Sequence, residues 1–172
     1  MTDDRDSPPQ TVERVIIHAA HRDWAMGELG PCLIVCWRGP VTEAALLQIN
    51  DKIFTFTQQH PGKCAYINVI ERSSPTPSAE LRKMTMAGLN RPGKALGCMV
   101  AVIEGHELRS TVVRAILTGM ALLRTHGPPT KFFKNTEEMS RWVTTLLASA
   151  VENDFDRDIV RAAEVIRREM PT

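Results

Sequence analysis

The sequence predicts an α/β fold, a single domain in which helices pack on a mixed sheet of about five strands. The clearest evidence is residues 96–138, which combine a short apolar run, a helical repeat and a second short strand. Residues 96–103 are apolar except for Gly97, which is typical of a strand buried on both faces. Apolar residues then recur at helical spacing, at Leu108, Val112, Ile116, Met120 and Leu123. A strand, a helix and a second strand in this order predict a right-handed parallel crossover.

The same alternation of strand and helix extends over most of the chain. Parallel strands are expected to start at Cys32, Cys64, Leu96 and Lys131. Residues 12–29 are expected to form an antiparallel strand or hairpin, because the turn signal at Gly30 and Pro31 is short.

Each expected helix begins at a side chain that can accept a hydrogen bond from its first turn. Thr42, Ser78 and Asn135 are the N-cap candidates, and Glu138 lies at the capping-box position after Asn135. The inner face of the first helix is expected at Leu46, Ile49, Ile53 and Phe56. That of the helix after Asn135 is expected at Met139, Trp142, Val143 and Leu146.

The two ends of the chain differ from the α/β domain, which is expected at residues 11–148. Residues 1–10 contain two prolines and four charged residues and predict a disordered tail. Residues 149–172 predict an amphipathic helix with Phe155, Ile159, Ala162 and Ile166 on one face. We expect this extra C-terminal helix to lie beyond the core, packed on the domain's own surface. The alternative is a helix that forms a homodimer or binds a partner.

The bulk composition favours a cytoplasmic protein that binds neither nucleic acid nor membrane. The chain has 172 residues and a net charge of +1, so its overall charge attracts no polyanion. No apolar run approaches the roughly 20 residues of a membrane span. The first ten residues are acidic and polar, unlike a secretory signal.

The cysteines indicate packing in the core rather than metal binding or redox chemistry. All four, Cys32, Cys36, Cys64 and Cys98, fall in expected strands, and no CxxC or CxxH spacing occurs. We therefore expect neither a metal nor a cofactor.

Two groups of polar residues follow the expected strands. At the carboxyl ends of two parallel strands, Glu71, Glu104 and His106 are expected to converge, with Arg109 nearby, as a possible ligand pocket. Two carboxylates and an imidazole suit a metal or acid–base chemistry, but solvated loop residues are the simpler interpretation. No nucleophile or phosphate-binding motif accompanies them.

The second group is a hydroxyl-rich loop that opens a helix. A phosphate on this loop would lie near basic side chains and a positive helix end, so it is a candidate regulatory or partner-binding site. A plain loop with an N-cap is the simpler interpretation. The residues concerned are Arg72, Ser73, Ser74, Thr76, Ser78 and Arg82.

Three short stretches, in order, resemble the STAS domain of anti-sigma-factor antagonists and sulphate transporters, with the SpoIIAA-like group most similar. They are residues 34–42 (IVCWRGPVT), residues 116–120 (ILTGM) and residues 132–138 (FFKNTEE) with the following Arg141, Trp142 and Val143. The similarity covers about residues 24–147. Family members that are switched by phosphorylation carry Asp-Ser-Ser/Thr-Gly in the loop, where residues 71–78 here read ERSSPTPS. No single serine is therefore assigned as the phosphorylated one.

The resemblance implies a bacterial, cytoplasmic, non-enzymatic signalling module that binds a kinase-like or anti-sigma-like regulatory protein. Two alternatives remain open. One is a small-molecule or lipid-binding protein with a pocket at the strand ends. The other is an enzyme that uses Glu71, Glu104 and His106. An exposed apolar patch around Met84, Met86 and Leu89 would favour the module, and a pocket would favour the binding protein.

Overall fold

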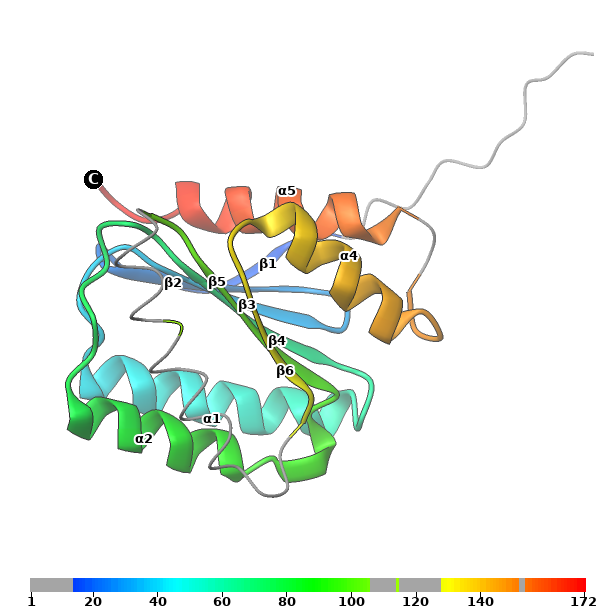
Figure 1. The fold of residues 1–172 in the computed structure, drawn as a ribbon, viewed down its shortest axis with the longest axis horizontal. Coiled ribbons are helices and arrows are strands. Elements are labelled where there is room, and N and C mark those ends of the chain that lie inside the picture. The colour runs from blue at the N-terminus through cyan, green and yellow to red at the C-terminus, as the bar shows by residue number, and fades with distance from the viewer. Residues whose placement is uncertain (1–13, 106–113, 115–127, 152–153) are drawn as a thin grey trace, which may run out of the picture.

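Six strands lie side by side in the order in which the chain forms them, in a computed structural model that describes residues 14–105, 114, 128–151 and 154–172 (Figure 1). The strands are β1 (Ile16–Ala20), β2 (Trp24–Leu29), β3 (Cys32–Trp37), β4 (Ala65–Ile70), β5 (Cys98–Ile103) and β6 (Thr130–Phe133). The expected tail at residues 1–10 and the expected helix after β5, apart from Arg114, lie outside the described residues.

The sheet confirms the predicted strand directions. β1, β2 and β3 pair antiparallel, and β3, β4, β5 and β6 pair parallel. The described sheet has six strands where about five were expected, because residues 12–29 supply two strands rather than one. A tight turn separates these two strands, in which the His21 N–H donates to the Trp24 carbonyl at 2.8 Å.

Four α-helices of the described chain cover the sheet, and their caps explain where the first three begin. They are α1 (Glu43–Gln59), α2 (Ala79–Asn90), α4 (Thr136–Leu147) and α5 (Phe155–Arg168). The side chains of Thr42, Ser78 and Asn135 each accept a backbone N–H from the first turn, as predicted. Glu138 departs from a full capping box, because its carboxylate accepts from the Asn135 side-chain amide at 3.2 Å.

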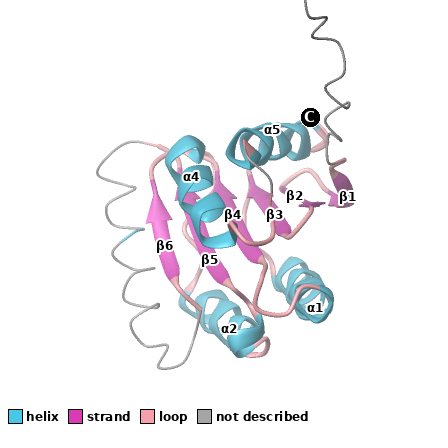
Figure 2. Cartoon of the chain, turned by 90° about the vertical axis from the view of Figure 1, so that its right-hand side faces the viewer, coloured by secondary structure: helices cyan, strands magenta, loops and turns pink. Residues whose placement is uncertain are grey.

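The helices form two layers, one on each face of the sheet. Figure 2 shows α1 and α2 on one side and α4 and α5 on the other. Alternate residues of each strand meet opposite layers, so Val35 packs in the α1 and α2 core while Ile34 packs in the α4 and α5 core. Every residue of β3 is buried, which explains the continuous apolar runs of the sequence.

Helix α5 belongs to the core, although the sequence analysis placed it beyond the core. It packs on β2 and β3, whereas α4 packs on β4, β5 and β6. Ile159, Ala162 and Ile166 are completely buried, so the predicted apolar stripe is used within the chain. Gly27 of β2 permits this approach, because a Cβ atom there would lie 2.8 Å from Ile166 Cδ1. On α4, Leu147 is buried and Leu146 is exposed, so the predicted inner face is wrong at that one position.

Replacing Ile159 with Ala is expected to destabilise the fold strongly. The variant leaves a cavity between α5 and the sheet and should lower the free energy of unfolding by roughly 2–5 kcal/mol. Leu47→Ala is the matched control, because Leu47 is 54% exposed and its truncation should change stability by less than about 0.5 kcal/mol. Urea unfolding measures both, and equal losses in the two variants would contradict the placement of α5 in the core.

All four cysteines are buried free thiols. Removal from water raises the pKa of Cys36 and of Cys98 to about 12 from an ordinary value of 9.0. In the unfolded chain these two thiols would ionise near their ordinary pKa of 9.0. The contribution of these neutral thiols to the free energy of unfolding is therefore complete below about pH 9 and is lost as the pH rises towards 12.

The free energy of unfolding of the reduced protein should fall between about pH 8 and about pH 10 by about 1.4 kcal/mol per thiol from this source. Cys36→Ala should show a fall that is smaller by that amount, whatever its stability at pH 8. Urea unfolding at the two pH values makes the measurement. An identical pH dependence in the variant would contradict the buried, neutral state of Cys36.

Candidate functional site

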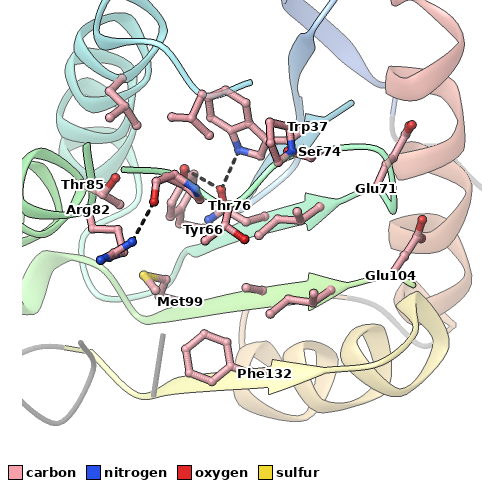
Figure 3. Close-up of a pocket in the computed structure, with 18 of the residues that line it drawn as sticks. Trp37, Tyr66, Glu71, Ser74, Thr76, Arg82, Thr85, Met99, Glu104 and Phe132 are labelled. Carbon is pink, nitrogen blue, oxygen red and sulfur yellow. Dashed lines mark hydrogen bonds between the residues drawn. The ribbon is translucent and has the colours of Figure 1, made fainter. Parts of the chain in front are cut away.

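A cavity of about 110 Å³ lies between the layer of α1 and α2 and the strands β4, β5 and β6 of the sheet (Figure 3). Its floor is the side-chain row of β4, β5 and β6 that faces this layer. Strand alternation fixes the row, because every second side chain of a strand points to the same face. The floor residues are Tyr66, Asn68, Ile70, Met99, Ala101, Ile103 and Phe132.

The walls come from elements far apart in the sequence. Leu46 of α1 and Trp37 of β3 close one side, and Thr85 and Leu89 of α2 close another. Residues 71–77, the loop after β4, form the wall at the strand ends. An exposed apolar patch around Met84, Met86 and Leu89 would favour the interaction module. Leu89 is only 2% exposed, and Met84 and Met86 are half-buried, so these side chains face partly into the protein.

Asn68 is the polar centre of the otherwise apolar floor. Its Oδ1 accepts hydrogen bonds from Trp37 Nε1 at 3.3 Å and from the Tyr66 hydroxyl at 2.9 Å (Figure 3). Because an indole N–H can only donate, this contact fixes which end of the amide is oxygen. Burial raises the pKa of the Tyr66 hydroxyl, so that hydroxyl stays protonated and donates. The Asn68 Nδ2 has no hydrogen-bond partner among the described residues, and Asn68 borders the cavity.

The hydroxyl-rich loop is held against the segment that follows β3. Ser73 Oγ donates to the Arg38 carbonyl at 2.8 Å, and Ser74 Oγ donates to the Gly39 carbonyl at 2.9 Å. Ser74 is 6% exposed, so its hydroxyl helps to hold the loop rather than facing solvent. Ser78 caps α2 and Thr76 is exposed on the cavity wall. Ser73 is thus exposed to solvent, whereas Ser74 is buried.

Glu71 and Glu104 lie together at the strand ends, and two arginines hold them. Arg38 contacts both carboxylate oxygens of Glu71, at 3.1 and 3.4 Å. Arg167 of α5 hydrogen-bonds Glu104 and lies 4.0 Å from Glu71. Burial opposes the charge of Arg167, but Glu104 and Glu71 outweigh it and raise its pKa.

Arg167 is not among the site residues that the sequence predicted, because no local pattern marks it. It occupies the last turn of a charged helix, and only the docking of α5 brings it to the strand ends. His106 and Arg109, the other members of the expected pocket, lie outside the described residues. Among the residues described, no group of three His, Cys, Asp or Glu side chains could hold a metal ion. None of the described helices is both long enough and apolar enough to cross a lipid bilayer.

Comparisons of the chain with protein-family models, with curated proteins and with solved structures found no match. The cavity and its chemistry are therefore the basis for any functional argument.

The ion pair between Arg167 and Glu104 is expected to couple α5 to the sheet. The two side chains are 25% and 30% exposed, so solvent screens their interaction only in part. A double-mutant cycle of Arg167→Gln and Glu104→Gln should give a coupling energy of about 1–2 kcal/mol in urea unfolding. Arg168→Gln is the control, because Arg168 is 78% exposed and should contribute less than about 0.5 kcal/mol. Additive single and double variants would contradict the coupling.

Proposed function

We propose that this protein is a non-enzymatic binding protein whose cavity holds a small molecule with a largely apolar body. The observation that carries the proposal is a cavity with a mostly apolar floor, in which Asn68 is the polar centre, and which reaches the carboxyl ends of the parallel strands β4 and β5. Cavities of this kind and position are the usual ligand sites of α/β folds.

The size of the cavity limits the ligand. A volume of about 110 Å³ is somewhat below the roughly 150 Å³ of an apolar cavity that binds benzene. The buried part of the ligand is therefore about one ring or a short aliphatic chain. Met99, Ala101 and Phe132 offer it an apolar surface.

The charged residues at the cavity mouth support binding over catalysis. Glu71 and Glu104 are the carboxylates that an acid–base or metal mechanism would use. Both are engaged by guanidinium groups, from Arg38 and Arg167. A carboxylate that is already bound to a guanidinium group has fewer oxygen lone pairs left for a substrate or a metal ion.

A second candidate is the regulatory interaction module that the STAS resemblance implies. The observation that favours it is the exposure of Arg72, Ser73, Thr76 and Ser78 on the loop after β4 and at the start of α2. This loop is also a cavity wall, so a partner would bind beside the ligand. Affinity capture with the wild type and with a Ser73→Arg, Thr76→Arg double variant tests it. Loss of a captured protein in the variant supports the module, and identical captures count against it.

Filling the cavity should abolish binding of a neutral ring-sized probe. Ala101→Leu places three further carbon atoms on the cavity floor, and benzyl alcohol is then expected to lose at least about tenfold in affinity. The readout is the Trp37 indole N–H signal in ¹H–¹⁵N NMR spectra, because Trp37 borders the cavity. Trp37→Phe identifies that signal.

Ala44→Leu is the control for this experiment. Ala44 lies on the exposed face of α1, so the substitution adds the same atoms without entering the cavity. It should leave both the affinity and the unfolding transition unchanged. Equal titrations for Ala101→Leu and wild type, with both folded, would rule out this cavity as the site.

A further inference from the structure

Four charged residues line the cavity, Glu71, Arg72, Arg82 and Glu104, and they differ in their contacts. Glu71 and Glu104 are matched by Arg38 and Arg167, so this cluster of two carboxylates and two guanidinium groups is close to neutral. Arg82 differs. Its Nη1 donates to the Pro77 carbonyl at 2.7 Å, and no carboxylate of the described residues lies within ion-pair distance of it.

Arg82 is half-buried and belongs to the cavity wall. Figure 3 shows it reaching from α2 beside the loop after β4. A guanidinium carries five N–H donors in a planar fork, and the Pro77 contact uses only Nη1. A partly desolvated cation without a counter-ion is costly unless a bound anion compensates it. The positive charge of Arg82 therefore favours an anionic group on the ligand.

Asn68 adds a second constraint. Its Oδ1 is taken by Trp37 and Tyr66, so what it can offer a ligand is the Nδ2 donor. An all-hydrocarbon ligand would leave this donor without an acceptor, which weakens binding. Both polar groups thus select for hydrogen-bond acceptors, and the apolar floor selects for hydrocarbon between them.

We propose that the ligand of this cavity is a small monocarboxylate with an aromatic ring or short aliphatic body, and that Arg82 binds its carboxylate. The planar fork of an arginine matches the two oxygens of a carboxylate, and one positive charge balances one negative charge. The inference rests on the proposed function and gives its ligand a chemical class.

Benzoate and benzyl alcohol are suitable probes, because they share a ring and differ in charge. Both are titrated at neutral pH into ¹⁵N-labelled protein, with the Trp37 indole N–H signal as readout. The wild type should bind benzoate at least about tenfold more tightly than benzyl alcohol. Arg82→Gln should remove this preference and leave the affinity for benzyl alcohol within about twofold.

Lys83→Gln is the matched control. It removes the same charge from the neighbouring position of α2, and Lys83 is exposed and does not line the cavity. This variant should keep the preference for benzoate. An unchanged affinity of Arg82→Gln for benzyl alcohol also shows that loss of the Pro77 contact has not collapsed the site.

The outcomes separate the inference from the function on which it rests. If the wild type binds both probes equally, or if Arg82→Gln keeps the preference, the carboxylate assignment is overturned and the binding function stands. If Lys83→Gln loses the preference as fully as Arg82→Gln, surface charge rather than the Arg82 fork explains it, and the assignment is again overturned. If neither probe shifts the Trp37 signal, both the inference and the proposed function fail.

Discussion

Strand β3 is buried on both faces of the sheet, and the packing of the helices follows from this constraint. Every residue of β3 is buried, so each face of the sheet needs its own helix layer. On one face, α4 covers β4, β5 and β6 but does not cover β2 and β3. Helix α5 covers those two strands. The last helix is thus required by the sheet, and its close approach depends on the missing side chain at Gly27.

Docking of α5 also determines the electrostatics at the strand ends. The helix brings Arg167 to Glu104 and close to Glu71, while Arg38 approaches Glu71 from the end of β3. The positive charges of the two arginines thereby offset the repulsion between the two carboxylates. The same packing that completes the core thus gives Glu104 its guanidinium partner.

On the opposite face, the polar side chain of Asn68 sits in an otherwise apolar row. Trp37 and Tyr66 satisfy its oxygen, which makes its burial tolerable, and its nitrogen remains for the cavity. Arg82 supplies a charge on the wall. The site that results has a mostly apolar floor, and Asn68 and Arg82 contribute hydrogen-bond donors to it.

The sequence alone determined the α/β class, the directions of the strands and the helix caps. These are local properties, because periodicity, turn residues and N-caps act over a few residues. Only the tertiary structure decided that α5 is core, that Arg167 meets Glu104, and that Arg82 and Asn68 share a cavity. Arg167 and Glu104 are 63 positions apart, and Asn68 looks like any strand residue in the sequence. Such contacts depend on how helices dock on a sheet, and no local pattern encodes that geometry.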